Sequence, residues 1–318
     1  MGDIVKLPSR NTLAPLLGLF VVYALFALLG PDSFSSARNL ETMARQTTIV
    51  GIAAIGMTLV IISGGIDLSA GSIIALSTVV VAATMNAGAS PLISAVAGMG
   101  AGALAGLANG LIITRLRVVP FIVTLGTLLI VRGLAKGIAD EQKIDAPLSW
   151  LIDLLSALSP SMRWMIVPPG VWLLVLLAIA VAAMLRSTPV GRHIIATGSS
   201  EATARLCGIR VERLKTGVYV ASGAAAGLAG VMQFSRLTVG DPTVAVGLEL
   251  DVIAAVVIGG GSLSGGEGSI LGTLVGALIM TIIRSGCSQM GLPNWVQEIV
   301  TGGIIVAAVA LDRWRHRR

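Results

Sequence analysis

Charged residues are scarce in this sequence. Only 12% of the 318 residues are Asp, Glu, Lys or Arg, whereas 55% are hydrophobic and the mean hydropathy is +0.91. Soluble globular domains carry roughly 25% charged residues, mostly on their surfaces. The composition therefore excludes a water-soluble fold and predicts a protein embedded in a lipid bilayer.

The residues that carry most enzyme chemistry are also few. There are two histidines, His193 and His316, and two cysteines, and neither kind has the spacing of a metal site. None of the lysines ends a G-x-x-x-x-G-K-[ST] phosphate loop. We expect no catalytic residue, metal or cofactor in this chain, so any ATP must be hydrolysed by another chain.

Aromatic residues make up only 4% of the chain, whereas there are 39 glycines. Lipid provides no hydrophobic force between helices, so membrane-spanning helices associate through close backbone contact at small residues. We expect this packing role for glycines at helical spacing in two segments. They are Gly98, Gly102 and Gly106, then Gly223, Gly227 and Gly230.

Apolar runs separated by short polar breaks recur along the whole chain. A helix of roughly 20 apolar residues crosses a bilayer core about 30 Å thick, whereas barrel strands would alternate apolar and polar residues. The runs predict an all-α polytopic transmembrane helical bundle, a single domain over 1–318 with about ten spans, some of them broken or re-entrant. The predicted spans are 13–29, 47–62, 68–85, 92–113, 118–134, 165–185, 216–233, 250–261, 270–284 and 296–311.

Lysine and arginine in the loops predict the orientation, because basic residues stay on the cytoplasmic side. With the N-terminus inside, fourteen of the 22 basic residues are cytoplasmic, and both termini are cytoplasmic. Residues 135–164 then form an outer loop suited to short interfacial helices, and 186–215 form a cytoplasmic loop. The net charge of +6 reflects anchoring in the bilayer and not nucleic-acid binding.

A polar break at 63–72 lies between two strongly apolar runs. Gly64 and Gly65 end one helix, and Asp67 can cap the next, which by itself accounts for a carboxylate at this position. The alternative is a broken helix that lines a translocation path. Our candidates for lining such a path are Asp67, Ser69, Ser72 and Asn109.

The cytoplasmic loop contains the signals of a short exposed helix. Ser199 or Ser200 can cap it, Glu201 falls in its first turn, and Gly208 can end it in the left-handed conformation. Such a helix could dock on a partner. From the residues alone, a connector that happens to be helical is the slightly favoured interpretation.

A glycine-rich segment at 260–270, GGSLSGGEGSI, matches 64–73, GGIDLSAGSI, with one residue inserted. Glycine-rich segments match each other easily, so the pair is only a weak indication of an internal repeat. In the predicted topology both segments lie at the cytoplasmic edge, where they could form paired re-entrant elements.

Several segments resemble the ribose-type sugar permeases of ATP-driven importers. Residues 56–72, GMTLVIISGGIDLSAGS, look like the family signature GMTLVI-x-x-GGIDLSVGS. Residues 190–209 are similar to the family's GR…AIGGNEEAARLSGI segment, and 250–260, LDVIAAVVIGG, resemble LDAIAAVVIGG. With Asn39 and Gln46 of an NL…RQ pattern, the resemblance covers nearly the whole chain.

This resemblance implies two permease copies, a cytoplasmic ATP-binding subunit and a periplasmic sugar-binding protein, in the bacterial inner membrane. It also implies that 199–209 touch the ATPase, which favours docking over the connector interpretation. The sequence departs from the family at 197–200 and at Cys207, where serine is common. The residues expected to couple to the ATPase are Gly191, Arg192, Ser200, Glu201, Ala202, Arg205 and Gly208.

Rival functions remain open at this point. Permeases for a nucleoside, a signalling furanose or a branched-chain amino acid look related, and specificity in the family rests largely with the binding protein. A stand-alone secondary carrier would need ionisable residues deep in its spans, and a membrane enzyme would need a nucleophile with a base. The sequence has almost no ionisable residues deep in its predicted spans and no pairing of a nucleophile with a base.

Overall fold

The computed structural model describes residues 10–158 and 164–315. In this part the chain is almost entirely helical, apart from two short 3-10 helices and a two-stranded antiparallel pairing of β1 (Ile144–Asp145) with β2 (Val239–Gly240). The helices are α1 (Arg10–Leu29), α2 (Ala37–Ile62), α3 (Ala70–Asn86), α4 (Pro91–Leu116), α5 (Pro120–Ile138), α6 (Pro169–Ser187), α7 (Pro189–Ser199), α8 (Glu201–Leu206), α9 (Val211–Leu237), α10 (Leu248–Ile258), α11 (Ile270–Gln289) and α12 (Asn294–Arg315).

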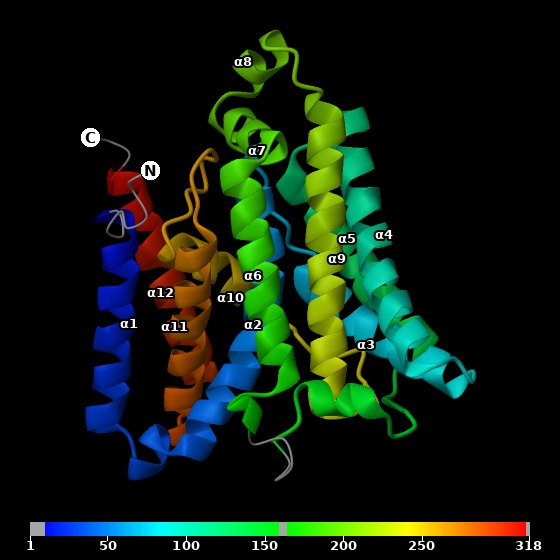
Figure 1. The fold of residues 1–318 in the computed structure, drawn as a ribbon, viewed down its shortest axis with the longest axis vertical. Helices are drawn as coiled ribbons and strands as arrows, with labels where there is room; N and C mark the ends of the chain where they lie inside the picture. The colour runs from blue at the N-terminus through cyan, green and yellow to red at the C-terminus, as the bar shows by residue number, and fades with distance from the viewer. Residues whose placement is uncertain (1–9, 159–163, 316–318) are drawn as a thin grey trace.

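The long helices run roughly alongside one another, with α7 and α8 projecting at one end (Figure 1). We call this the α8 end, and we call the end where α2 begins and α11 finishes the far end. The interior is apolar and centred on α2 and α3, which are buried along most of their lengths. The start of α1 and the finish of α12 lie toward the α8 end (Figure 1).

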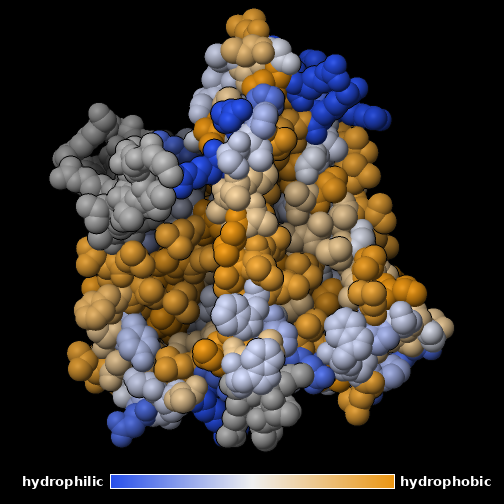
Figure 2. Space-filling view, viewed as in Figure 1, coloured by the Kyte–Doolittle hydropathy of each residue, from blue (hydrophilic) through white to orange (hydrophobic). Residues whose placement is uncertain are grey.

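Large apolar side chains also cover the outside of the bundle. Figure 2 shows hydrophobic residues over the middle of one face and hydrophilic residues toward its two ends. Leu104, Leu129 and Leu176 are each 67% exposed, although they belong to three different helices. In water such a surface would aggregate, whereas in a bilayer it contacts lipid.

Glycines pack α4 directly against α9. A Cβ at Gly102 would overlap the backbone of Gly223 and Gly227, and one at Gly106 would overlap the backbone of Tyr219. The close approach replaces side-chain contacts with backbone contacts, as expected where lipid competes for every apolar surface. The packing role predicted for these glycines is confirmed.

A helix stands at each of the ten predicted spans. Six of them, α2, α4, α5, α6, α9 and α11, have the length and hydropathy to cross a membrane, while α1 and α3 contain shorter apolar helices. The 11 residues of α10 rise only about 16 Å, too little to cross the hydrocarbon core alone. The polytopic helical class is confirmed, and ten crossings and the cytoplasmic termini remain predictions.

The boundaries predicted from hydropathy were wrong in several places. α2 begins ten residues before the predicted 47–62, because its first turns are polar and the helix is instead started by the Ser36 cap, which accepts from the Asn39 amide. α5 continues to Ile138, into the predicted outer loop 135–164. That loop contains one short 3-10 helix, Trp150–Leu154, and its residues 159–163 lie outside the described residues.

Candidate functional site

Three of the four predicted path residues meet in the break between α2 and α3. The Ser69 hydroxyl donates to Asp67 Oδ1 over 2.5 Å, and Asn109 Nδ2 of α4 donates to Ser69 Oγ over 3.0 Å. All three side chains are at most 1% exposed. The network therefore holds the broken segment against α4 and is closed off from solvent.

The expected cap by Asp67 needs a correction. Asp67 Oδ1 accepts from the Ser69 amide over 2.9 Å, but Ser69 is itself the residue that precedes α3, so Asp67 stabilises the turn and not the first turn of the helix. Asp67 Oδ2 has no hydrogen-bond partner in the described part of the chain. Ser72 is fully buried, does not join the network, and likewise has a hydroxyl without a partner there.

The two glycine-rich segments that match in sequence also meet in space. The Gly266 amide donates to the Ile62 carbonyl at the finish of α2 over 2.8 Å, and a Cβ on Gly265 would lie 3.0 Å from the Gly64 Cα. Gly64, Gly265 and Gly266 all have positive φ, where residues other than glycine are strained. The chain thus needs glycine on both sides of this contact.

Gly198 of α7 completes this contact. A Cβ at Gly198 would overlap the Ile62 carbonyl oxygen and lie 2.6 Å from the Gly266 nitrogen. We call Gly64, Gly198, Gly265 and Gly266 the glycine junction. Through it, α7 rests directly on the finish of α2 and on the loop between α10 and α11.

Most of the predicted cytoplasmic loop 186–215 is helical. Thr188 caps α7 by accepting from the Gly191 amide over 3.2 Å, and Pro189 occupies the first turn. Gly191 is buried where a Cβ would overlap the Leu185 backbone, so it lets α7 fold back on α6. Arg192 is exposed and has no ion-pair partner in the described ranges.

The predicted short helix is present as α8. Ser200, not Ser199, is its cap: Ser200 Oγ accepts from the Thr203 amide over 3.3 Å. Gly208 follows the helix with φ of +83°, the left-handed conformation that ends a helix without strain in glycine. Ser199 instead belongs to the last turn of α7.

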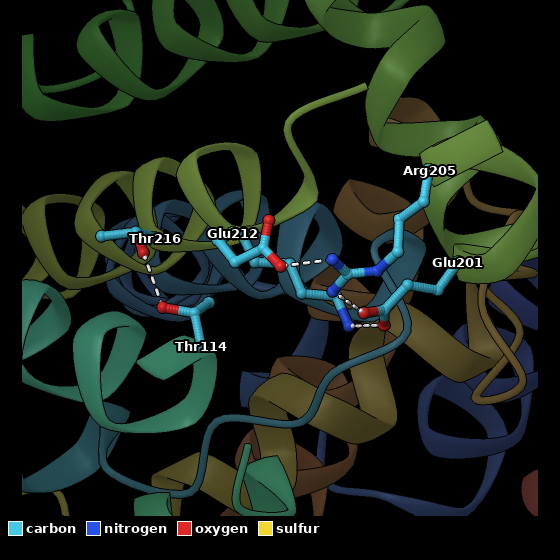
Figure 3. Close-up of polar contacts among 6 residues, drawn as sticks. Thr114, Glu201, Arg205, Glu212 and Thr216 are labelled. Carbon is cyan, nitrogen blue, oxygen red and sulfur yellow. Dashed lines mark hydrogen bonds and ion pairs between the residues drawn. The ribbon is translucent and has the colours of Figure 1, made fainter. Parts of the chain in front are cut away.

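Ion pairs fix α8 to the first turns of α9 (Figure 3). Glu201 contacts both Lys215 and Arg205, and Arg205 Nη2 lies 2.7 Å from Glu201 Oε1 while Nη1 contacts Glu212. The hydrogen bonds from Lys215 and then Arg205 hold the pKa of the Glu201 carboxyl below its usual range. The carboxylate is therefore charged at neutral pH.

The tip of α8 is exposed. Leu206 is 88% exposed, and Ala202, Cys207 and Gly208 are also exposed. Figure 2 shows a hydrophobic patch at the top of the molecule, where Figure 1 places α8.

Sequence reasoning missed Lys215, Gly198 and the whole of α7. The capping pattern Thr188-Pro189 was a usable signal for α7. Lys215 is 14 residues from Glu201 and pairs with it only because the chain reverses between α8 and α9. No local pattern identifies such a pair.

Known proteins resemble this chain over almost its full length. A family model described as a branched-chain amino acid transport system permease component matches residues 39–309. The chain belongs to this permease family. The match covers the glycine junction, α8 and the network at Asp67.

Individual permeases of the family match closely. The ribose import permease RbsC of Escherichia coli strain K12 is 38% identical over 93% of this chain and 92% of its own length. RbsC of Bacillus subtilis strain 168 is 38% identical over 95% and 92%, and the L-arabinose permease AraH of Azospirillum brasilense is 34% identical over 100% and 91%. No solved structure matches.

Membership of the permease family confirms the resemblance found in the sequence. These relatives are named as transport permeases and not as enzymes. Together with six helices able to cross a bilayer, membership makes this chain a multi-pass integral membrane protein of the sugar permease type.

Proposed function

We propose that the chain is the membrane-spanning permease subunit of a bacterial ATP-driven importer that carries a pentose or hexose across the inner membrane. The observation that carries this proposal is the match to ribose and L-arabinose permeases over nearly their whole lengths. The chain works as one domain over 1–318 and as a pair of copies. A cytoplasmic ATP-binding subunit supplies the energy, and a periplasmic sugar-binding protein delivers the solute.

In this proposal the α8 end faces the cytoplasm and receives the force of ATP binding. The exposed Leu206 at the tip of α8 docks on the ATPase. The ion pairs of Glu201 transmit the motion of the ATPase to α9. The coupling residues remain those predicted, with Gly191 and Gly208 shaping the segment, Ser200, Glu201 and Arg205 ordering it, and Arg192 and Ala202 exposed on it.

The path itself then opens and closes by alternating access. Asp67, Ser69 and Asn109, closed off in this conformation, are proposed to line the path when the break between α2 and α3 moves, and Ser72 lies one turn further on. The unpartnered Asp67 Oδ2 and Ser72 hydroxyl support this, because buried polar groups without partners are rare outside functional sites.

A hydrolysis assay tests the proposal. The chain, purified with its ATPase and placed in lipid vesicles, should hydrolyse ATP faster when the sugar-loaded binding protein is added. Gly208→Ala should uncouple hydrolysis from transport, because alanine strains a backbone at φ of +83° although no atom lies within 4 Å of the new Cβ. Unchanged transport in that variant would remove the coupling role.

A branched-chain amino acid importer is the second candidate, because the matching family model carries that description. A thermal-shift screen of the binding protein separates the two. Stabilisation by pentoses or hexoses supports the sugar importer, whereas stabilisation by leucine, isoleucine or valine supports the alternative.

A further inference from the structure

A polar cavity of about 360 Å³ lies at the far end of the bundle, opposite α8. Its walls come from the start of α2, the finish of α9, the start of α10, the finish of α11 and the start of α12. Small-molecule sites commonly have volumes of roughly 300 to 1,000 Å³. None of the predicted path residues lines this cavity.

Two side-chain amides in the cavity have no partner among the described residues. Gln233 is only 7% exposed and Gln46 is half-buried, and neither side chain forms a hydrogen bond with the residues that the structure describes. Buried amides normally satisfy their hydrogen-bonding groups inside the protein. These two are free to donate to and accept from a guest.

A buried carboxylate offers a third contact. Asp251 is 1% exposed, and its Oδ2 lies 2.6 Å from Arg284 Nη2, while Oδ1 has no partner in the described ranges. Arginine compensates the charge, so the pair presents a hydrogen-bond acceptor without a net charge. Asp251 is the one acidic residue that the described chain contributes to the cavity lining, so no unpaired anion is left to balance the ammonium group of an amino acid. Arg236 of α9 also lines the cavity and has no ion-pair partner in the described ranges.

Neighbouring bonds hold the cavity wall in place. Asn39 accepts from the Ser285 hydroxyl over 3.1 Å and from Gln289 Nε2 over 3.3 Å, and it donates to the Phe34 carbonyl over 2.8 Å. The hydrogen-bonding groups of the Asn39 side chain are thus occupied within the protein. Those of Gln46, two turns further along α2, have no partner in the described ranges. Both residues belong to the NL…RQ pattern that resembles the family, and neither is among the residues proposed to couple to the ATPase.

We propose that this cavity binds one neutral, polyhydroxylated solute, a monosaccharide, before it enters the closed part of the path. Gln46 and Gln233 would donate to and accept from its hydroxyl groups, and Asp251 would accept from another. A hydroxyl and an amide both donate and accept, so the chemistry matches a sugar. The inference rests on the proposed function and adds the place at which the permease itself holds its substrate.

Direct occupancy is tested by protection of a cysteine. Thr42→Cys places a thiol in the cavity wall, and Ser35→Cys places one at the same end outside it, both with the exposed Cys207 changed to serine. A charged methanethiosulfonate reagent is applied to vesicles of the permease–ATPase complex without binding protein. Ribose or L-arabinose should slow labelling of Thr42→Cys several-fold and leave Ser35→Cys unchanged, whereas leucine should slow neither.

Transport measurements test the named contacts. Gln233→Leu keeps the shape and removes the amide, and Gln142→Leu makes the same change on an exposed residue outside the cavity. Loss of one or two hydrogen bonds should lower sugar uptake by about three- to tenfold in Gln233→Leu. Uptake and ATP hydrolysis should both stay unchanged in the control Gln142→Leu, and Gln46→Leu replaces Gln233→Leu if the latter does not fold.

The outcomes separate the two proposals. Equal labelling with and without every sugar, or protection by leucine alone, overturns the cavity proposal even if the importer carries sugar. Absence of sugar uptake by the unaltered importer instead overturns the proposed function, and the protection assay still decides whether the cavity binds a sugar.

Discussion

The two ends of the bundle are built differently. At the α8 end, backbones touch at the glycine junction and the charges of Glu201 and Arg205 are paired. At the far end, a cavity of about 360 Å³ is lined by Gln46, Gln233 and Asp251. Only one carboxylate oxygen of Asp251 has a partner in the described ranges. Backbone contacts and paired charges hold the α8 end together, whereas unpartnered polar groups line the cavity at the far end.

This difference separates two tasks that a transport subunit must perform. Rigid contacts transmit motion, because packed interfaces deform little before they switch. Polar groups without a protein partner can bind a solute in a cavity, because the solute supplies the missing hydrogen bonds. The account therefore predicts that changes at the α8 end affect coupling and changes at the far end affect the solute.

Gly198→Ala should have the largest effect, because a Cβ there meets the Ile62 carbonyl and the Gly266 nitrogen, both of them backbone. Overpacking of this kind costs about 1–3 kcal/mol or more, and we expect transport to be lost. Gly217→Ala in α9 is the matched control, since no atom lies within 4 Å of its new Cβ. Uptake assays and thermal unfolding in detergent compare the two, and normal transport by Gly198→Ala would contradict the rigid junction.

Glu201→Gln should uncouple the subunits while leaving the fold intact. The change removes the ion pairs with both Lys215 and Arg205, whereas the control Glu212→Gln removes only one contact of Arg205. Exposed pairs contribute about 0–1 kcal/mol each, so stability should change little. Sugar carried per ATP hydrolysed should fall more in Glu201→Gln than in the control, and equal ratios would argue against a coupling role.

Asp67 lies in the break between α2 and α3, and its replacement should lower both stability and transport. Asp67→Ala removes the acceptor for the Ser69 amide and hydroxyl, which should cost about 1–3 kcal/mol of unfolding free energy. Asp67→Asn keeps an acceptor oxygen and should cost less. A larger loss of transport than of stability in Asp67→Asn would show that the carboxylate serves the path itself.

The smallest expected effect is that of mild acid on the ion pairs that hold α8. Because Lys215 and Arg205 lower the pKa of Glu201, its ion pairs are complete above the usual glutamate value and are lost only as pH falls through the lowered value. Protease protection of α8 should therefore stay constant across the neutral range. A loss of protection near neutral pH would contradict this assignment.

Much of the fold followed from local patterns in the sequence. Apolar runs located the helices, and Ser200 with Gly208 defined α8, because capping and the left-handed turn depend on a few adjacent residues. The match between 64–73 and 260–270 indicated one side of the glycine junction, but the contact of Gly198, the Lys215 pair and the polar cavity could not be predicted. Each depends on residues far apart in the chain, such as Gln46 and Gln233, which line one cavity only because the helices pack together.

Uptake of radiolabelled sugar into vesicles, with and without the ATP-binding subunit, tests the central claim most directly. This chain has no phosphate-loop sequence and is proposed to provide the path and not the motor. The account predicts concentrative uptake only when the ATPase, ATP and the loaded binding protein are all present. Uptake against a gradient by the chain alone would contradict it and make the protein a secondary carrier.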